Sequence, residues 1–284
     1  TGKPPLIQDP TSQSKSDHPD FGSVTSFLKG IGDKTMPPYV TIPRNPYMTR
    51  PTYLGLHHSG FEAGDANSKS YQPPQVKLAA GRDGEFLSNR RSLIKEFDRL
   101  RSDLDGRGQL EGVDRFRELA FDLMTSPHVG KAFAIDQEPE ELRDRYGRNE
   151  WGQACLLARR LAEHGTAAIN IYFNTPKSGQ EFTNWDDHIM NAGRPGHFGK
   201  YMRVRLPYMD QALSTLIEDV FNRGLDKKIL IVVVGEFGRT PRLSVNSQGT
   251  GRNHWPQSCS ALVSGGGLRM GQVVGATNSK AEYP

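Results

Sequence analysis

The sequence predicts an α/β fold with a mostly parallel sheet. Residues 229–234 form a continuous apolar, largely β-branched run, which is typical of a strand buried on both faces of a parallel sheet. A second candidate strand spans 167–173, and a long amphipathic pattern lies between the two. Strand, helix and strand in this order indicate a crossover connection within one sheet. Polar residues follow both strands, where open α/β sheets place their ligands.

Residues 1–80 form a loop-rich segment with many Pro, Gly, Ser and Asn residues and little periodicity. We expect only a short helix over 22–29 and a short strand over 39–42. Aromatic residues recur throughout the segment, which argues against disorder: Tyr39, Tyr47, Tyr53, Phe61 and Tyr71. The segment is therefore predicted to consist of loops that lie over a folded core.

Residues 81–165 are predicted to be mostly helical. Apolar residues recur at helical spacing over 86–100, 113–123 and 151–161. Two prolines bracket a further short piece at 127–139. Glycines follow the first and last of the long patterns, where helices commonly end. This segment contains no pattern that points to chemistry.

Residues 166–284 contain the strands and the polar clusters. An amphipathic helix is predicted from Pro207 to Gly224, because proline suits the first turn of a helix and glycine suits the position after its end. A last short strand is expected over 260–263. A chain of 284 residues can bury a core as one large domain or two small ones.

The charge pattern argues against a nucleic-acid partner. The formal net charge of +4 and the pI near 9.0 are modest for this length, and no basic run is interleaved with aromatic residues. No apolar run is long enough to span a bilayer. The two cysteines, Cys155 and Cys259, fit no zinc spacing and leave one disulfide open. Because the chain begins Thr1-Gly2-Lys3, we expect it to be an interior piece of a longer polypeptide.

The predicted crossover brings two polar clusters to one edge of the sheet. The first is Trp-Asp-Asp-His at 185–188, and the second contains Glu236 and Arg239, followed by His254. Carboxylates and imidazoles together suit zinc, manganese or iron, and magnesium if the carboxylates dominate. A divalent ion could polarise a phosphate or sulfate ester or lower the pKa of a water. Arg239 could pair with an oxyanion through two hydrogen bonds.

Each of these residues also has a purely structural interpretation. Asp186 and Asp187 could satisfy backbone amides of a loop or a helix start. Glu236 could form an ion pair with a nearby arginine, and His254 could pack within its loop. No single residue is specific, so the hypothesis of a shared site depends on the fact that the polar clusters follow predicted buried strands.

Three further motifs carry a resemblance to a known family. They read Gly-Glu-Phe-Gly-Arg-Thr-Pro at 235–241, Gly-Arg-Asn-His-Trp-Pro at 251–256 and Gly-Gly-Gly-Leu-Arg-Met-Gly-Gln-Val-Val-Gly-Ala-Thr at 265–277. With the residues at 185–188 they resemble domain of unknown function 1501, a family abundant in planctomycetes and related bacteria. That family is grouped with the alkaline phosphatase and sulfatase superfamily. The resemblance implies a single three-layer α/β/α domain over 1–284, lacking parts of the full domain at both ends.

The resemblance also implies a ligand set and an activity. In the superfamily an Asp and a His from one loop after a strand bind a metal, and Asp186 and His188 match them. A later acid and a last histidine match Glu236 and His254. With Arg239 on the substrate oxyanion, this set implies a hydrolase of sulfate or phosphate esters, on small molecules or glycans. The divalent metal would be zinc, manganese, magnesium or calcium.

Two departures from the family pattern support a second hypothesis. Asn253 stands where family members usually have Asp, and Phe237 follows Glu236 where the superfamily typically has His after an Asp. The alternative is a non-catalytic envelope binding or assembly protein with a degenerate metal site. Members commonly begin with a twin-arginine export signal, which implies a periplasmic or cell-envelope location for either hypothesis. The sequence does not fix the oligomeric state.

Overall fold

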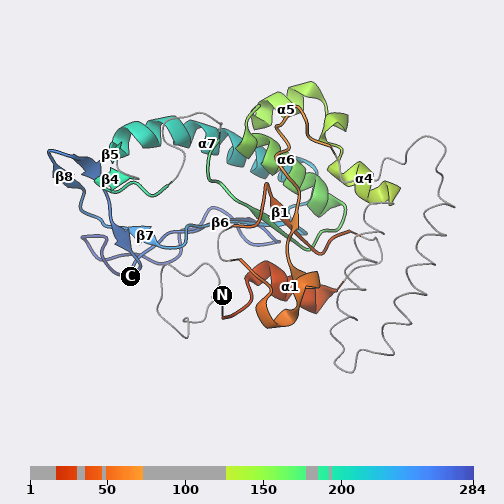
Figure 1. The fold of residues 1–284 in the computed structure, drawn as a ribbon, viewed down its shortest axis with the longest axis horizontal. Coiled ribbons are helices and arrows are strands. Elements are labelled where there is room, and N and C mark those ends of the chain that lie inside the picture. The colour runs from red at the N-terminus through yellow and green to blue at the C-terminus, as the bar shows by residue number, and fades with distance from the viewer. Residues whose placement is uncertain (1–16, 31–35, 47–48, 73–125, 177–184, 192–193) are drawn as a thin grey trace. The chain divides into compact units, whose positions relative to one another are not determined.

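The structure is a computed structural model, and Figure 1 shows its elements in chain order. It describes residues 17–30, 36–46, 49–72, 126–176, 185–191 and 194–284. Contacts within the chain define two compact units. The first comprises Thr1–Gln137 and Arg160–Tyr172, and the second comprises Glu138–Arg159 and Phe173–Pro284.

The first unit is built on a three-stranded parallel sheet. Strand β1 (Tyr39–Ile42) lies between β2 (Phe61–Glu62) and β3 (Ala168–Ile171) and runs parallel to both. All four residues of β1 are buried, as expected of a central strand rich in aromatic and β-branched residues. The mixed α/β class is therefore confirmed, and so are the strands predicted near 39–42 and 167–173.

Short helices complete the first unit. Helix α1 (Phe21–Lys29) begins after Asp20, whose carboxylate accepts a hydrogen bond from the backbone N–H of Ser23 at 3.1 Å, which satisfies one of the free amides at the helix start. Helix α4 (Pro127–Phe133) begins with a proline in its first turn. The described part of this unit also contains the 3-10 turns η1 (Thr52–Leu54), η2 (Leu56–His58) and η3 (Ile135–Gln137).

The second unit contains α5 (Glu140–Tyr146), most of α6 (Glu150–Glu163) and α7 (Phe198–Asn222). Helix α6 confirms the helical pattern predicted over 151–161. Helix α7 is one continuous helix (Figure 1), and Pro207 lies inside it rather than at its start. The predicted start at Pro207 was therefore wrong, because a proline within a helix removes one hydrogen bond without always ending the helix.

Strand β6 (Leu230–Val233) differs from its prediction. It pairs antiparallel with β11 (Leu262–Gly265) in a sheet of two strands. Ile231 is 9% exposed, whereas Val232 is 53% exposed, so the strand is buried on one face only. The prediction of a strand buried on both faces of a parallel sheet was wrong. A run of β-branched residues indicates a strand, but it does not identify the partner strand or its direction.

The other strands of the second unit form short antiparallel pairs. Strand β4 pairs with β5, β7 with β10, and β8 with β9. Their bounds are β4 (Met190–Asn191), β5 (Arg194–Pro195), β7 (Gly238–Arg239), β8 (Ser244–Asn246), β9 (Gly249–Gly251) and β10 (His254–Trp255). Of the residues predicted to carry chemistry, Arg239 lies in β7 and His254 in β10, whereas Asp186 and His188 lie in the loop before β4 and Glu236 lies between β6 and β7.

Some predictions fall on other parts of the chain. The helices predicted over 86–100 and 113–123 lie outside the described residues. Both cysteines are free thiols, Cys155 buried and Cys259 exposed, so the disulfide left open by the sequence is not formed. Within the described ranges, no helix combines the length and the apolar character needed to cross a membrane.

Candidate metal site

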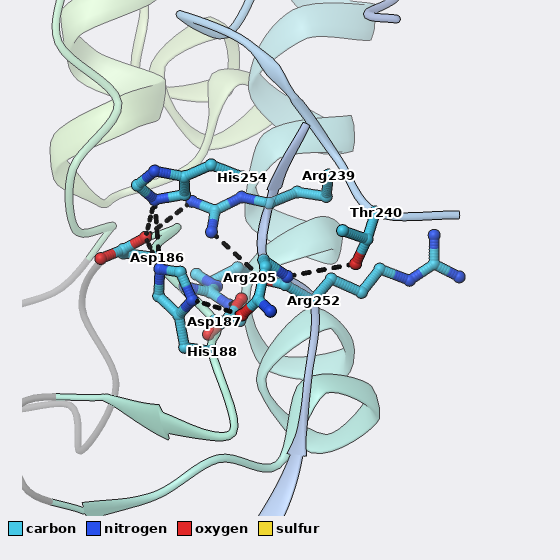
Figure 2. Close-up of polar contacts among 9 residues, drawn as sticks. Asp186, Asp187, His188, Arg205, Arg239, Thr240, Arg252 and His254 are labelled. Atoms are coloured by element: carbon cyan, nitrogen blue, oxygen red, sulfur yellow. Dashed lines mark hydrogen bonds and ion pairs between the residues drawn. The ribbon is translucent and has the colours of Figure 1, made fainter. Parts of the chain in front are cut away.

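Two segments that lie far apart in the sequence meet in the second unit. Asp186 and His188 lie in the loop before β4, and His254 opens β10. Strand β10 pairs antiparallel with β7 so that His254 lies opposite Arg239. Side chains of directly opposed residues lie on the same face of a strand pair. Figure 2 shows the side chains of His254, Asp186 and His188 converging.

A close backbone approach joins these two segments. Gly251 is buried, and a Cβ atom at this position would overlap the backbone of His188 and Ile189. Next to it, the backbone N–H of Arg252 donates to the carbonyl oxygen of Asp187 at 2.8 Å. A glycine therefore lets the 251–254 segment lie directly against the loop that carries His188.

Three of the four predicted metal ligands come together. The Nε2 atoms of His188 and His254 lie 2.9 Å and 3.0 Å from Oδ1 of Asp186. The two Nε2 atoms are 3.1 Å apart. Within the described residues, these three form a group of potential ligands whose donor atoms all lie within 4.8 Å of one another.

This donor set fits a divalent metal ion. Two imidazole nitrogens and one carboxylate oxygen form a mixed N/O set that suits zinc, manganese or iron. An ion about 2.0–2.2 Å from each ligand atom requires those atoms to lie roughly 3 Å or slightly more apart, and this spacing is present. The three side chains are 27–50% exposed, so solvent and a small ligand can reach them. The coarse prediction of a divalent metal site is consistent with this geometry.

Arg239 extends to the same carboxylate oxygen. Its Nη2 lies 2.9 Å from Oδ1 of Asp186, and its Nη1 donates to the carbonyl oxygen of Arg252 at 3.3 Å. The guanidinium is thus fixed from two directions beside the potential ligands. A positive, planar group held there can pair with an anionic ligand group.

The electrostatic environment keeps Asp186 ionised. Partial burial acts to raise the pKa of its carboxyl group, but hydrogen bonds from His254 and Arg239 lower it more, so the pKa lies below its ordinary value of 3.8. A lowered carboxyl pKa stabilises the folded state at higher pH, and this contribution is lost as the pH falls through the folded pKa. At neutral pH the site therefore offers the charged carboxylate that a metal requires.

Asn253 holds the ring of His188. Its Oδ1 lies 3.0 Å from Nδ1 of His188, so it accepts a hydrogen bond when that nitrogen carries the proton. Asn253 is itself held by Thr240 through two hydrogen bonds, at 2.9 Å and 3.2 Å. A proton on Nδ1 leaves the Nε2 lone pair free to bind a metal. Asn253, noted in the sequence only as a departure from the family pattern, thus contacts the far side of a potential metal ligand.

Asn253→Ala is expected to weaken binding of Zn²⁺ or Mn²⁺ about 10–100-fold, the usual cost of losing the outer partner of a ligating histidine. Asn253→Asp keeps the acceptor and is expected to retain or increase affinity, because a carboxylate makes the imidazole more basic. Isothermal titration of each variant with the metal measures both effects. An alanine variant with wild-type affinity would show that this contact has no influence on the ligand.

Asp187, which lies between the potential ligands Asp186 and His188, forms a buried ion pair with Arg205 between Oδ2 and Nη2. The pKa of Asp187 is raised, chiefly by burial, although Arg205 acts to lower it. Asp187 was expected near the site from its position in the sequence, whereas Arg205 was not. A signal existed, since Arg205 follows buried Tyr201 by four residues and so lies on the buried face of α7.

Glu236 is placed differently from its prediction as a ligand. It is exposed and is not part of the group formed by the other three. The structure also bears on the interpretations in which Glu236 pairs with a nearby arginine and His254 only packs within its loop. Arg239 pairs with Asp186. The side chain of His254 points toward the same carboxylate, and the centre of its ring lies 4.2 Å from the centre of the Phe237 ring.

Comparison with known proteins identifies a family without indicating an activity. A family model described as "Protein of unknown function (DUF1501)" matches residues 5–284. No curated protein and no solved structure matches the chain. Any functional conclusion must therefore come from the site itself.

Proposed function

The chain belongs to the DUF1501 family, and we propose that it is a metal-dependent hydrolase of sulfate or phosphate esters. The observation that carries the proposal is the convergence of Asp186, His188 and His254, whose donor atoms lie within 4.8 Å of one another. The guanidinium of Arg239 beside these residues supports the proposal further. Sulfate and phosphate groups are anionic, and a planar guanidinium can bind two of their oxygens at once.

Each side chain would have a defined part in this chemistry. Asp186, His188 and His254 would hold the ion. When bound, a divalent ion supplies charge that polarises an ester oxygen or lowers the pKa of a water. Arg239 would bind and orient the oxyanion of the ester, and it is already oriented by Asp186 and by the Arg252 carbonyl. Asn253 would hold His188 in the tautomer that keeps Nε2 available.

The resemblance adds two further elements to the proposal. An alkaline phosphatase-like three-layer fold and a periplasmic or envelope location both remain predictions. Substrates would be sulfate or phosphate esters of small molecules or glycans, because either kind carries the anionic group that Arg239 would bind. Fractionation of cells that express the native protein tests the location separately from the chemistry.

A non-catalytic envelope binding or assembly protein is the second candidate. Two observations favour it: Glu236 lies outside the ligand group, and Asn253 occupies the position where family members usually have Asp. A degenerate site would bind metal weakly or not at all. Metal analysis of the purified protein, together with assays on aryl sulfates and aryl phosphates, separates the two candidates. About one bound ion with metal-dependent hydrolysis supports the enzyme, and neither metal nor activity supports the alternative.

Arg239→Gln is expected to lower kcat/KM for an aryl phosphate or sulfate by about 10²–10³-fold, the usual cost of removing a group that stabilises a developing oxyanion. Metal content should stay at the wild-type level, because Arg239 is not a ligand. Arg242→Gln is the matched control, since this neighbouring arginine is exposed and should keep full activity. Equal activity in both variants would remove Arg239 from the proposed mechanism.

A further inference from the structure

Asp187 lies between two potential ligands but faces the interior. Asp186 and His188 are partly exposed, whereas the Asp187 side chain is 2% exposed. Its carboxylate forms an ion pair with the guanidinium of Arg205 on α7, and the Arg205 side chain is completely buried. Figure 2 shows this pair behind the ligand group. The loop is thus attached to a long helix at the residue between its two ligands.

The attachment extends beyond the ion pair. The guanidinium carbon of Arg205 lies 4.9 Å from the centre of the Trp185 ring. Trp185 stacks on Trp151 of α6, with ring centres 5.6 Å apart and planes 14° apart, and its Nε1 donates to the carbonyl oxygen of Phe173 at 2.5 Å. Two loop residues, Trp185 and Asp187, are therefore fixed by contacts in the interior, while the potential ligands on either side of Asp187 remain accessible.

Asp187 also holds the opposite segment of the site. Its carbonyl oxygen accepts the hydrogen bond from the backbone N–H of Arg252, at 2.8 Å, two residues before His254. One residue thus connects α7 through its side chain and the His254 segment through its backbone. The spacing between the ligands of the two segments depends on where Asp187 sits.

The pair is poorly arranged for stability alone. Among the described residues, Oδ1 of Asp187 and both Nε and Nη1 of Arg205 are buried without a hydrogen-bond partner. A buried ion pair with unsatisfied atoms gives little net stabilisation, and well-packed apolar residues often replace such a pair without loss. A positional role explains its presence better than a stabilising one.

We propose that the buried Asp187–Arg205 pair positions the Asp186–His188 loop for metal binding, as a support that contacts neither the metal nor a substrate. This inference rests on the metal site of the proposed function. It does not require that the site hydrolyses esters.

The double variant Asp187→Leu/Arg205→Met tests the proposal, because it replaces the pair with apolar side chains. Affinity for Mn²⁺ or Zn²⁺ is expected to fall about 10–100-fold, as for other outer contacts of metal ligands. The thermal midpoint of the metal-free protein should stay close to that of the wild type. Arg205→Lys keeps the charge but not the geometry of the guanidinium, so its metal affinity should lie between those of the wild type and the double variant. Arg203→Met, at an exposed position on the same helix, should change neither quantity.

Each outcome decides the inference. A folded double variant with wild-type metal affinity would overturn it. If the double variant does not fold, Arg205→Lys becomes the deciding variant: a loss of affinity in the folded protein supports the inference, and wild-type affinity overturns it. Amide exchange provides a readout without metal, because the Arg252 amide should exchange faster once Asp187 is released, and unchanged exchange counts against the proposal. A wild-type protein that binds metal but hydrolyses no ester defeats the proposed function while leaving this test in force.

Discussion

Replacing His254 with alanine is expected to abolish divalent metal binding at micromolar protein concentration. The substitution removes one of three ligand atoms and leaves Asp186 and His188, whose mutual contact is 2.9 Å. Loss of a direct ligand should exceed the roughly 10–100-fold cost of losing an outer contact. Metal content after dialysis and titration with Zn²⁺ or Mn²⁺ both measure the change.

His197→Ala is the matched control for this variant. His197 is exposed, lies in the same unit and makes no side-chain cap for α7. Its replacement should leave metal content unchanged. If both alanine variants keep the metal of the wild type, His254 is not a ligand and the site as described does not bind an ion.

The second large effect concerns stability rather than chemistry. Asp219 of α7 is 8% exposed, and its carboxylate is contacted by three side chains. Arg159 Nε and Arg223 Nε lie 2.9 Å and 2.7 Å from its oxygens, and the Tyr146 hydroxyl donates to Oδ2 at 2.9 Å. Burial, together with Asp219, raises the pKa of Tyr146, so this hydroxyl remains a donor at neutral pH. The network joins α5, α6 and α7.

Asp219→Ala is expected to lower the free energy of unfolding by about 1–3 kcal/mol, because it leaves the buried Tyr146 hydroxyl and the Nε of Arg159 without their acceptor, while Arg159 keeps its ion pair with Glu138 at 2.9 Å. Glu218→Ala removes an exposed ion pair with Arg145 and should cost less than about 1 kcal/mol. Chemical denaturation of the two variants measures the difference. Equal losses at the two neighbouring positions would mean that the Asp219 network does not stabilise the unit.

Local patterns were sufficient to predict several elements. Strand β1 and helix α6 are confirmed, because β1 is a short run of aromatic and β-branched residues and the apolar residues of α6 recur at helical spacing. The clustering of Asp186, His188 and His254 was also predicted, although the reasoning used one parallel sheet. In the structure, the three residues meet through Gly251 and the β7–β10 pair instead.

Non-local partners were not predictable from these patterns. The run at 229–234 indicated a strand, but its antiparallel pairing with β11 depends on residues some thirty positions later. Pro207 suggested a helix start, but the preceding residues continue the helix through it. Arg205 was missed because a charged residue in a helix is read as exposed unless its partner is known, and Asp187 lies in a distant loop.

The most direct measurement is anomalous diffraction from crystals of the protein soaked in Zn²⁺ or Mn²⁺. We predict one strong anomalous peak about 2.0–2.2 Å from Asp186 Oδ1 and from the Nε2 atoms of His188 and His254. A protein that crystallises with these three side chains free to bind, yet shows no peak among them, would contradict the central claim.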